Sequence, residues 1–80
     1  MRTVRAARGR PVRVSPRRDG QPYTSASVSL GGQDVELEVV NGEITIVGNA
    51  WKLIREDTTI TGRWDGGLEK LQLEVLSHAR

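Results

Sequence analysis

Residues 25–46 read SASVSLGGQDVELEVVNGEITI, and this stretch decides the fold because apolar and polar residues alternate through it between two turn signals. Asn41-Gly42 fits the type I′ turn of a two-residue β-hairpin, which needs positive φ at both central residues. Gly31-Gly32 marks a second hairpin turn upstream. The stretch therefore predicts three consecutive antiparallel strands.

The two turns predict one consistent register. The Asn-Gly turn pairs Val39 with Ile44, and the Gly-Gly turn pairs Val28 with Val35. Both turns place Leu37 on the same apolar face, as a three-stranded sheet requires. The serines at positions 25, 27 and 29 fall on the opposite face, which we expect to be solvated.

Residues 51–75 predict a continuation of the same sheet. A turn at Glu56-Asp57 pairs Leu53 with Ile60, and it sets the Trp51 indole over the bare backbone of Gly62. A further turn at Gly66-Gly67 pairs Ile60 with Leu73.

Residues 68–80 fit two interpretations. Their apolar residues also fall on one helical stripe, but the alternation from Leu71 to Val75 favours a strand.

The predicted fold is all-β: a small antiparallel meander of about six strands, strongly curled or closed into a small barrel. Residues 20–80 form this single β domain, and residues 1–19 form an Arg-rich N-terminal arm in which Val12 and Val14 offer an extra edge strand. One face of the sheet is apolar and cannot face water. Barrel closure, a second copy of the chain or another protein has to cover it.

Composition narrows the class of protein. The chain has 80 residues and no cysteine, so it is long enough for one domain and carries neither a disulfide nor a thiolate metal site. No apolar run approaches the roughly 18–20 residues that span a bilayer, and no apolar signal segment begins the chain. We expect a soluble, cytoplasmic protein that has no contact with a membrane.

Catalysis has little support in the sequence. The single histidine, His78, is the third residue from the C-terminus, and the serines follow one strand without a neighbouring base. One histidine and scattered carboxylates lack the spacing of metal ligands. The glycines mark hairpin turns and no phosphate-binding loop. We expect a protein that is not an enzyme and has no catalytic residue, metal or cofactor.

The net charge of +2 hides an asymmetry. Residues 1–18 hold seven arginines and no acid, whereas residues 19–80 hold five basic and ten acidic side chains, a formal charge of −5. Arginine pairs with phosphate through a planar fork of donors. An unfolded basic arm is a common means of holding a nucleic-acid backbone. The expected nucleic-acid-binding residues are those of the arm and three of the body: Arg2, Arg5, Arg8, Arg10, Arg13, Arg17, Arg18, Lys52, Arg63 and Lys70.

The aromatic residues add little to this hypothesis. Alternation places Trp51 and Trp64 on the apolar side of the sheet, where we expect them in the core. Tyr23, near the exit of the arm, could supply one ring for stacking on a base. The partner is DNA or RNA, without a preference between them, bound through backbone contacts. The alternative is a structural or adaptor protein of an oligomeric or virion-like assembly, in which the arm meets an acidic protein surface or a second copy of the chain.

Overall fold

Three consecutive strands form the centre of the sheet, as the quoted stretch predicts: β3 (Ser25–Leu30), β4 (Gln33–Val40) and β5 (Glu43–Ile46). The computed structural model describes residues 2–17 and 20–76. The predicted pairs Val28–Val35 and Val39–Ile44 are both confirmed. Asn41 has φ 51° and the following glycine φ 78°, the positive values that a type I′ turn needs.

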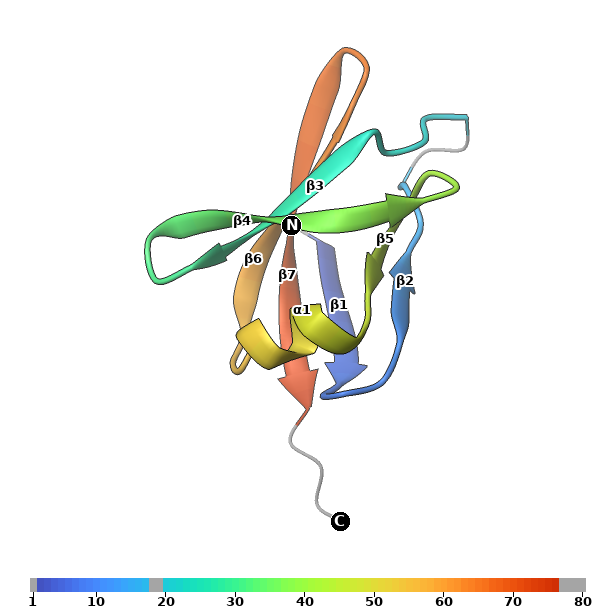
Figure 1. The fold of residues 1–80 in the computed structure, drawn as a ribbon. Helices are drawn as coiled ribbons and strands as arrows, with labels where there is room; N and C mark the ends of the chain where they lie inside the picture. Colours follow the sequence, from blue (N-terminus) through green and yellow to red (C-terminus); the bar gives the residue numbers. More distant parts are fainter. Residues whose placement is uncertain (1, 18–19, 77–80) are drawn as a thin grey trace.

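The sheet continues into seven strands that curl until they nearly close as a barrel (Figure 1). The all-β, barrel-like fold is therefore confirmed. Its strand order, β1-β7-β6-β3-β4-β5-β2, differs from a simple meander because β6 (Thr58–Trp64) pairs with β3, and β7 (Gly67–Leu76) pairs with β6. The two N-terminal strands lie at its edges.

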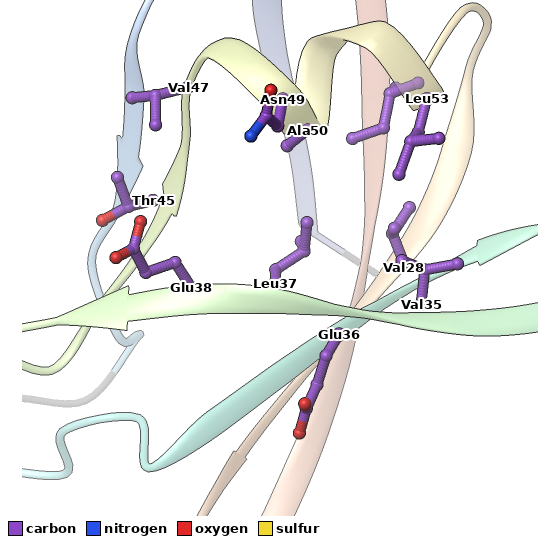
Figure 2. A pocket seen from close by; sticks show the side chains of 11 residues that line it. Val28, Val35, Glu36, Leu37, Glu38, Thr45, Val47, Asn49, Ala50 and Leu53 are labelled. Carbon is purple, nitrogen blue, oxygen red and sulfur yellow. The ribbon is translucent and has the colours of Figure 1, made fainter.

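The segment after β5 is a short helix, α1 (Gly48–Leu53), so the strand and the turn at Glu56-Asp57 expected here are wrong. A strand would bury Trp51 and Leu53 together. The structure instead buries Trp51 and Ile54, three residues apart, and leaves Leu53 55% exposed. Figure 2 shows Ala50 and Leu53 of α1 facing β4. The segment is helical because the helix covers one open end of the barrel. The local sequence pattern carries no information about that end. No helix in the described ranges has the length and apolar character needed to cross a membrane.

The hairpin of β6 and β7 is shifted by two residues from its expected register. Its turn falls at Asp65-Gly66, so that Trp64 pairs with Gly67 and Ile60 with Leu71. A two-residue shift returns every side chain to its predicted face, because strand side chains alternate with a period of two. Residues 67–76 are strand, as the alternation favours, and residues 77–80 lie outside the described part.

The N-terminal segment is folded, so the expectation of an unfolded arm is wrong for residues 2–17. β1 (Arg2–Ala7) pairs in parallel with β7, and β2 (Val12–Val14) pairs antiparallel with β5, which confirms the extra edge strand. Val4 lies in register with Leu73, and Val12 with Ile46. The arm therefore supplies apolar side chains to the barrel as well as charges to its surface.

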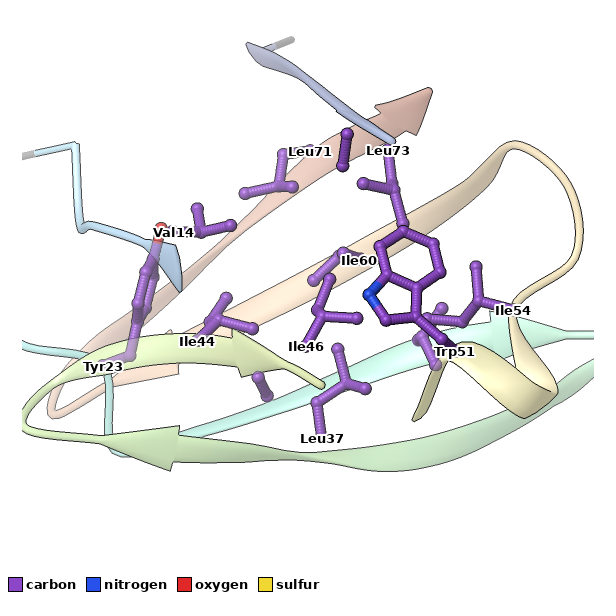
Figure 3. Close-up of a cluster of buried hydrophobic side chains, with 13 residues drawn as sticks. Val14, Tyr23, Leu37, Ile44, Ile46, Trp51, Ile54, Ile60, Leu71 and Leu73 are labelled. Atoms are coloured by element: carbon purple, nitrogen blue, oxygen red, sulfur yellow. The ribbon is translucent and has the colours of Figure 1, made fainter. Parts of the chain in front are cut away.

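The core fills the inside of the barrel (Figure 3). It brings together side chains from most of the strands and from α1, and those with less than 2% of their surface exposed are Ile44, Ile46, Ile54, Ile60, Leu71, Leu73 and Val28. Trp51 packs into this cluster from α1, as expected of a core tryptophan. The chain thus covers the inner face of its own sheet by closure.

The bare backbone of Gly62 meets Tyr23 rather than the expected Trp51. An ideal Cβ at Gly62 would lie 2.8 Å from Tyr23 Cδ1, and the ring is only 2% exposed. An aromatic ring packed over a strand glycine covers backbone that would otherwise be bare. This contact fixes the tyrosine inside the barrel.

We expect Gly62→Ala to lower the free energy of unfolding by about 1–3 kcal/mol, because the buried ring has little room to move. Gly67→Ala is the matched control: its Cβ would lie 3.2 Å from Trp64 Nε1, a half-buried ring, so the loss should stay below about 1 kcal/mol. Urea denaturation followed by circular dichroism measures both. Equal stabilities of Gly62→Ala and the wild type would contradict the tight packing of Tyr23.

Candidate nucleic-acid interface

Four arginines follow one path over the outside of the barrel, from the turn after β1, along β2, to the segment beyond it. Val12 and Val14 of β2 point inward, so Arg13 between them points to solvent. All four side chains are exposed. We call this set the basic strip: Arg8, Arg10, Arg13 and Arg17.

A hydrogen bond ties α1 to the basic strip. The indole Nε1 of buried Trp51 donates to the backbone oxygen of Arg10 at 2.7 Å. The backbone nitrogen of Arg10 in turn donates to the oxygen of Ala7 at 3.1 Å, which closes the turn. Lys52, the neighbour of Trp51, is exposed in the last turn of α1. The hydrogen bond from Trp51 thus joins the segment that carries Lys52 to the backbone of the strip.

The charges of the basic strip have no acidic partner in the part of the chain that is described. The two ion pairs found there join Arg2 to Glu69 at 3.9 Å and Arg5 to Glu74 at 2.9 Å. Both are on β1, outside the strip. One carboxylate does lie on this path: Glu43 Oε2 accepts from Ser15 Oγ at 2.7 Å, between Arg13 and Arg17. Four guanidinium groups against this single acid leave a net positive charge, which favours a polyanion.

The other expected phosphate-binding residues do not join the strip. Arg63 donates from Nη1 to Ser27 Oγ at 3.1 Å on the outer face of β6 and β3. Lys70 is exposed on β7 opposite Thr61, and β7 pairs with β1 and β6 rather than with β2. The expected continuous track through both is therefore absent among residues 2–17 and 20–76. Arg18 lies outside the described residues.

The serines of β3, which we expected on a solvated face, are less exposed than the sequence predicts. Ser27 is only 6% exposed, because β4 and β6 flank it and the Arg63 side chain reaches its hydroxyl. Ser29 is exposed as expected, and Ser25 is half-buried. The wet-face prediction is thus wrong for Ser27.

A polar cluster closes the barrel at the end remote from α1. Arg2 Nη1 donates to the backbone oxygen of Ser15 at 2.9 Å, and Tyr23 Oη donates to Glu69 Oε1 at 2.6 Å. Ser15 lies between Arg13 and Arg17, so the contact from Arg2 holds the strip against β1. The stacking role expected of Tyr23 is wrong, because its ring is buried in the core.

The pKa of Tyr23 is raised to about 12 by desolvation on burial, and further by its hydrogen bond to Glu69 and the charge of that carboxylate. Arg2 opposes the shift. The phenol therefore stays protonated and keeps donating throughout the neutral range.

An apolar groove lies on another side of the molecule, between α1 and β4 (Figure 2). Val35, Leu37 and Leu53 line it, and its volume is about 270 Å³. Glu36 and Glu38 of β4 also belong to its lining, with Glu36 directed away from the helix (Figure 2). These carboxylates repel phosphate, so the groove and the basic strip are chemically distinct surfaces.

The described ranges contain no cluster of three or more histidine, cysteine or carboxylate side chains able to hold a metal ion. His78 lies outside the described residues. Comparison with protein-family models, with curated proteins and with solved structures finds no match for this chain.

Trp64 is a further residue that the sequence analysis misplaced. We expected it in the core, but it is half-buried and lines a surface cleft with Arg17. The position of Trp64 could have predicted this exposure. The residue ends a strand directly before the turn at Asp65-Gly66, where a side chain has fewer neighbours than at the middle of a strand.

The single tyrosine of the chain makes its titration directly observable. We expect the phenolate absorbance of the folded protein to rise with a midpoint near pH 12, compared with about 10 for the unfolded chain. Because the folded pKa is the higher one, the stability that this group contributes is complete below pH 10 and is lost as the pH rises toward 12.

Glu69→Gln is the control for this titration. It removes the carboxylate charge and leaves the burial in place, so the pKa should fall part of the way toward 10. A wild-type midpoint at 10 with the fold intact would contradict the buried hydrogen bond.

Proposed function

We propose that this chain is a non-enzymatic nucleic-acid-binding protein whose basic strip holds the phosphate backbone. One observation carries the proposal: Arg8, Arg10, Arg13 and Arg17 are exposed along one path without an acidic partner among the described residues. Lys52, the exposed neighbour of Trp51 on α1, is a further cation that we assign to this surface. A row of arginines on a strand matches a chain of phosphates in charge and in its linear form.

The folded state of the strip favours binding. Arg10 and Arg13 sit on backbone that is held by Trp51 and by β5, so less chain entropy is lost on binding than for an unfolded arm. Contacts of this kind orient the nucleic acid without reading its sequence. The proposal therefore covers DNA and RNA alike.

The test is a fluorescence-anisotropy titration of labelled DNA and RNA at several salt concentrations. Replacing Arg8, Arg10, Arg13 and Arg17 together with glutamine should weaken binding at low salt. It should also reduce the slope of log affinity against log salt by about 0.7–0.9 for each lost phosphate contact.

Arg5→Gln is the matched control, because Arg5 lies on β1, which precedes the strip in the chain, and its charge is paired to Glu74. It should leave the salt slope nearly unchanged. Absence of wild-type binding at low salt, or equal losses in the control and the fourfold variant, would overturn the proposal.

A second candidate function is that of an adaptor acting through protein–protein contacts. The groove between α1 and β4 favours it, since Leu53 is 55% and Val47 is 39% exposed beside it. Exposed apolar side chains around a concave surface are typical of interaction sites.

Light scattering distinguishes the two candidates. A stable oligomer without nucleic acid that Leu53→Asp dissociates would favour the adaptor. A monomer that binds polynucleotide in a salt-dependent manner, with Leu53→Asp unaltered in that binding, would favour the first candidate.

A further inference from the structure

A second cleft lies where the basic strip ends, next to the turn of β6 and β7. This turn lies far from α1 in the fold (Figure 1). Its volume is about 270 Å³, enough for a small planar ring system and below the usual size of sites for larger ligands. Apolar walls and a few polar groups line it, namely Pro16, Arg17, Gln21, Trp64, Leu68 and Glu69.

The indole of Trp64 is held in place as one wall of this cleft. It lies over Gly67, where an ideal Cβ would approach Nε1 at 3.2 Å and Cε2 at 3.3 Å. It also packs against Tyr23, with ring centroids 6.2 Å apart and planes inclined by 45°. Because Tyr23 is fixed in the core, Trp64 has a rigid neighbour. A ring positioned in advance stacks on a ligand with little loss of side-chain entropy.

The cleft also has the charge that a nucleotide requires. Arg17 is both the last residue of the basic strip and a lining residue, so a strand following the strip reaches the cleft with a phosphate beside this guanidinium. The negative charge of Glu69 at the cleft is offset by Arg2 at 3.9 Å.

We propose that this cleft holds an unpaired base of a single-stranded nucleic acid, stacked on Trp64 with the adjoining phosphate on Arg17. The proposal rests on the phosphate-binding function of the strip and adds the class of nucleic acid. Stacking on an aromatic side chain needs a free base face, which a single strand offers and the interior of a duplex does not.

Glu69 gives the site a preference among bases. Its Oε1 accepts from Tyr23, and within residues 2–17 and 20–76 its Oε2 has no hydrogen bond. A carboxylate oxygen accepts from the exocyclic amino group of cytosine, whereas thymine presents a carbonyl at the same position. The cleft therefore prefers cytosine to thymine.

The experiment compares the wild type with Trp64→Leu and Trp64→Phe, using labelled oligo(dC), oligo(dT) and a duplex of equal length. Trp64→Leu keeps an apolar side chain and removes the stacking face. It should weaken single-strand binding roughly 5- to 150-fold and leave duplex binding within about two-fold. Trp64→Phe keeps an aromatic face and should retain most of the affinity.

Intrinsic tryptophan fluorescence gives a second readout, which does not depend on whether Trp64→Leu folds. Oligo(dC) should quench the fluorescence of the wild type, and this change should be lost in Trp64→Phe, where buried Trp51 is the remaining tryptophan. No quenching at saturating oligonucleotide would overturn the stacking.

The outcomes separate this inference from the function on which it rests. Suppose that binding depends on salt and on the basic strip but is equal in the wild type and Trp64→Leu. This result would overturn the base-binding role of the cleft and leave the proposed function standing. Equal losses on single strand and duplex would also overturn it, because stacking predicts a loss on single strands alone. Absence of all polynucleotide binding would overturn both. Equal affinities for oligo(dC) and oligo(dT) would overturn the role of Glu69.

Discussion

The inner face of the sheet consists of isoleucine, leucine and valine side chains that have to be kept from water, and an 80-residue chain has few residues with which to cover them. The barrel solves this problem with its own N-terminal segment. Val4 of β1 and Val14 of β2 line the two edges of the sheet, and alternation then directs Arg5 and Arg13 outward. The placement of the basic residues is thus a consequence of burying the apolar residues between them.

The same contacts close the barrel and hold the basic strip. At one end, Trp51 covers the core and donates to the backbone of Arg10. At the other end, Tyr23 fills the space over Gly62, and Arg2 reaches the backbone of Ser15. Loss of either closure would loosen the strip as well as expose the core. Stability and the arrangement of surface charge are therefore coupled in this protein.

The surface separates charges that nearly cancel in the total. The basic strip follows β2, whereas exposed carboxylates follow β4 beside the apolar groove. The small barrel therefore has two chemically different surfaces, one basic and the other apolar with an acidic margin. The Trp64 cleft adds an aromatic wall to the basic side, where Arg17 ends the strip.

The sequence by itself determined the central hairpins, because Asn41-Gly42 and Gly31-Gly32 restrict the backbone locally and the alternation around them allows one register. It also identified the arginines as the dominant charges of the first 18 residues. Only the tertiary structure decided that Arg2 and Arg5 face acids on β7 while Arg13 remains exposed, because the parallel pairing of β1 with β7 joins segments about 70 residues apart. The helix at 48–53 and the exposure of Trp64 were decided in the same way. Each depends on which part of the closed barrel lies beside it, and a local pattern carries no information about so distant a neighbour.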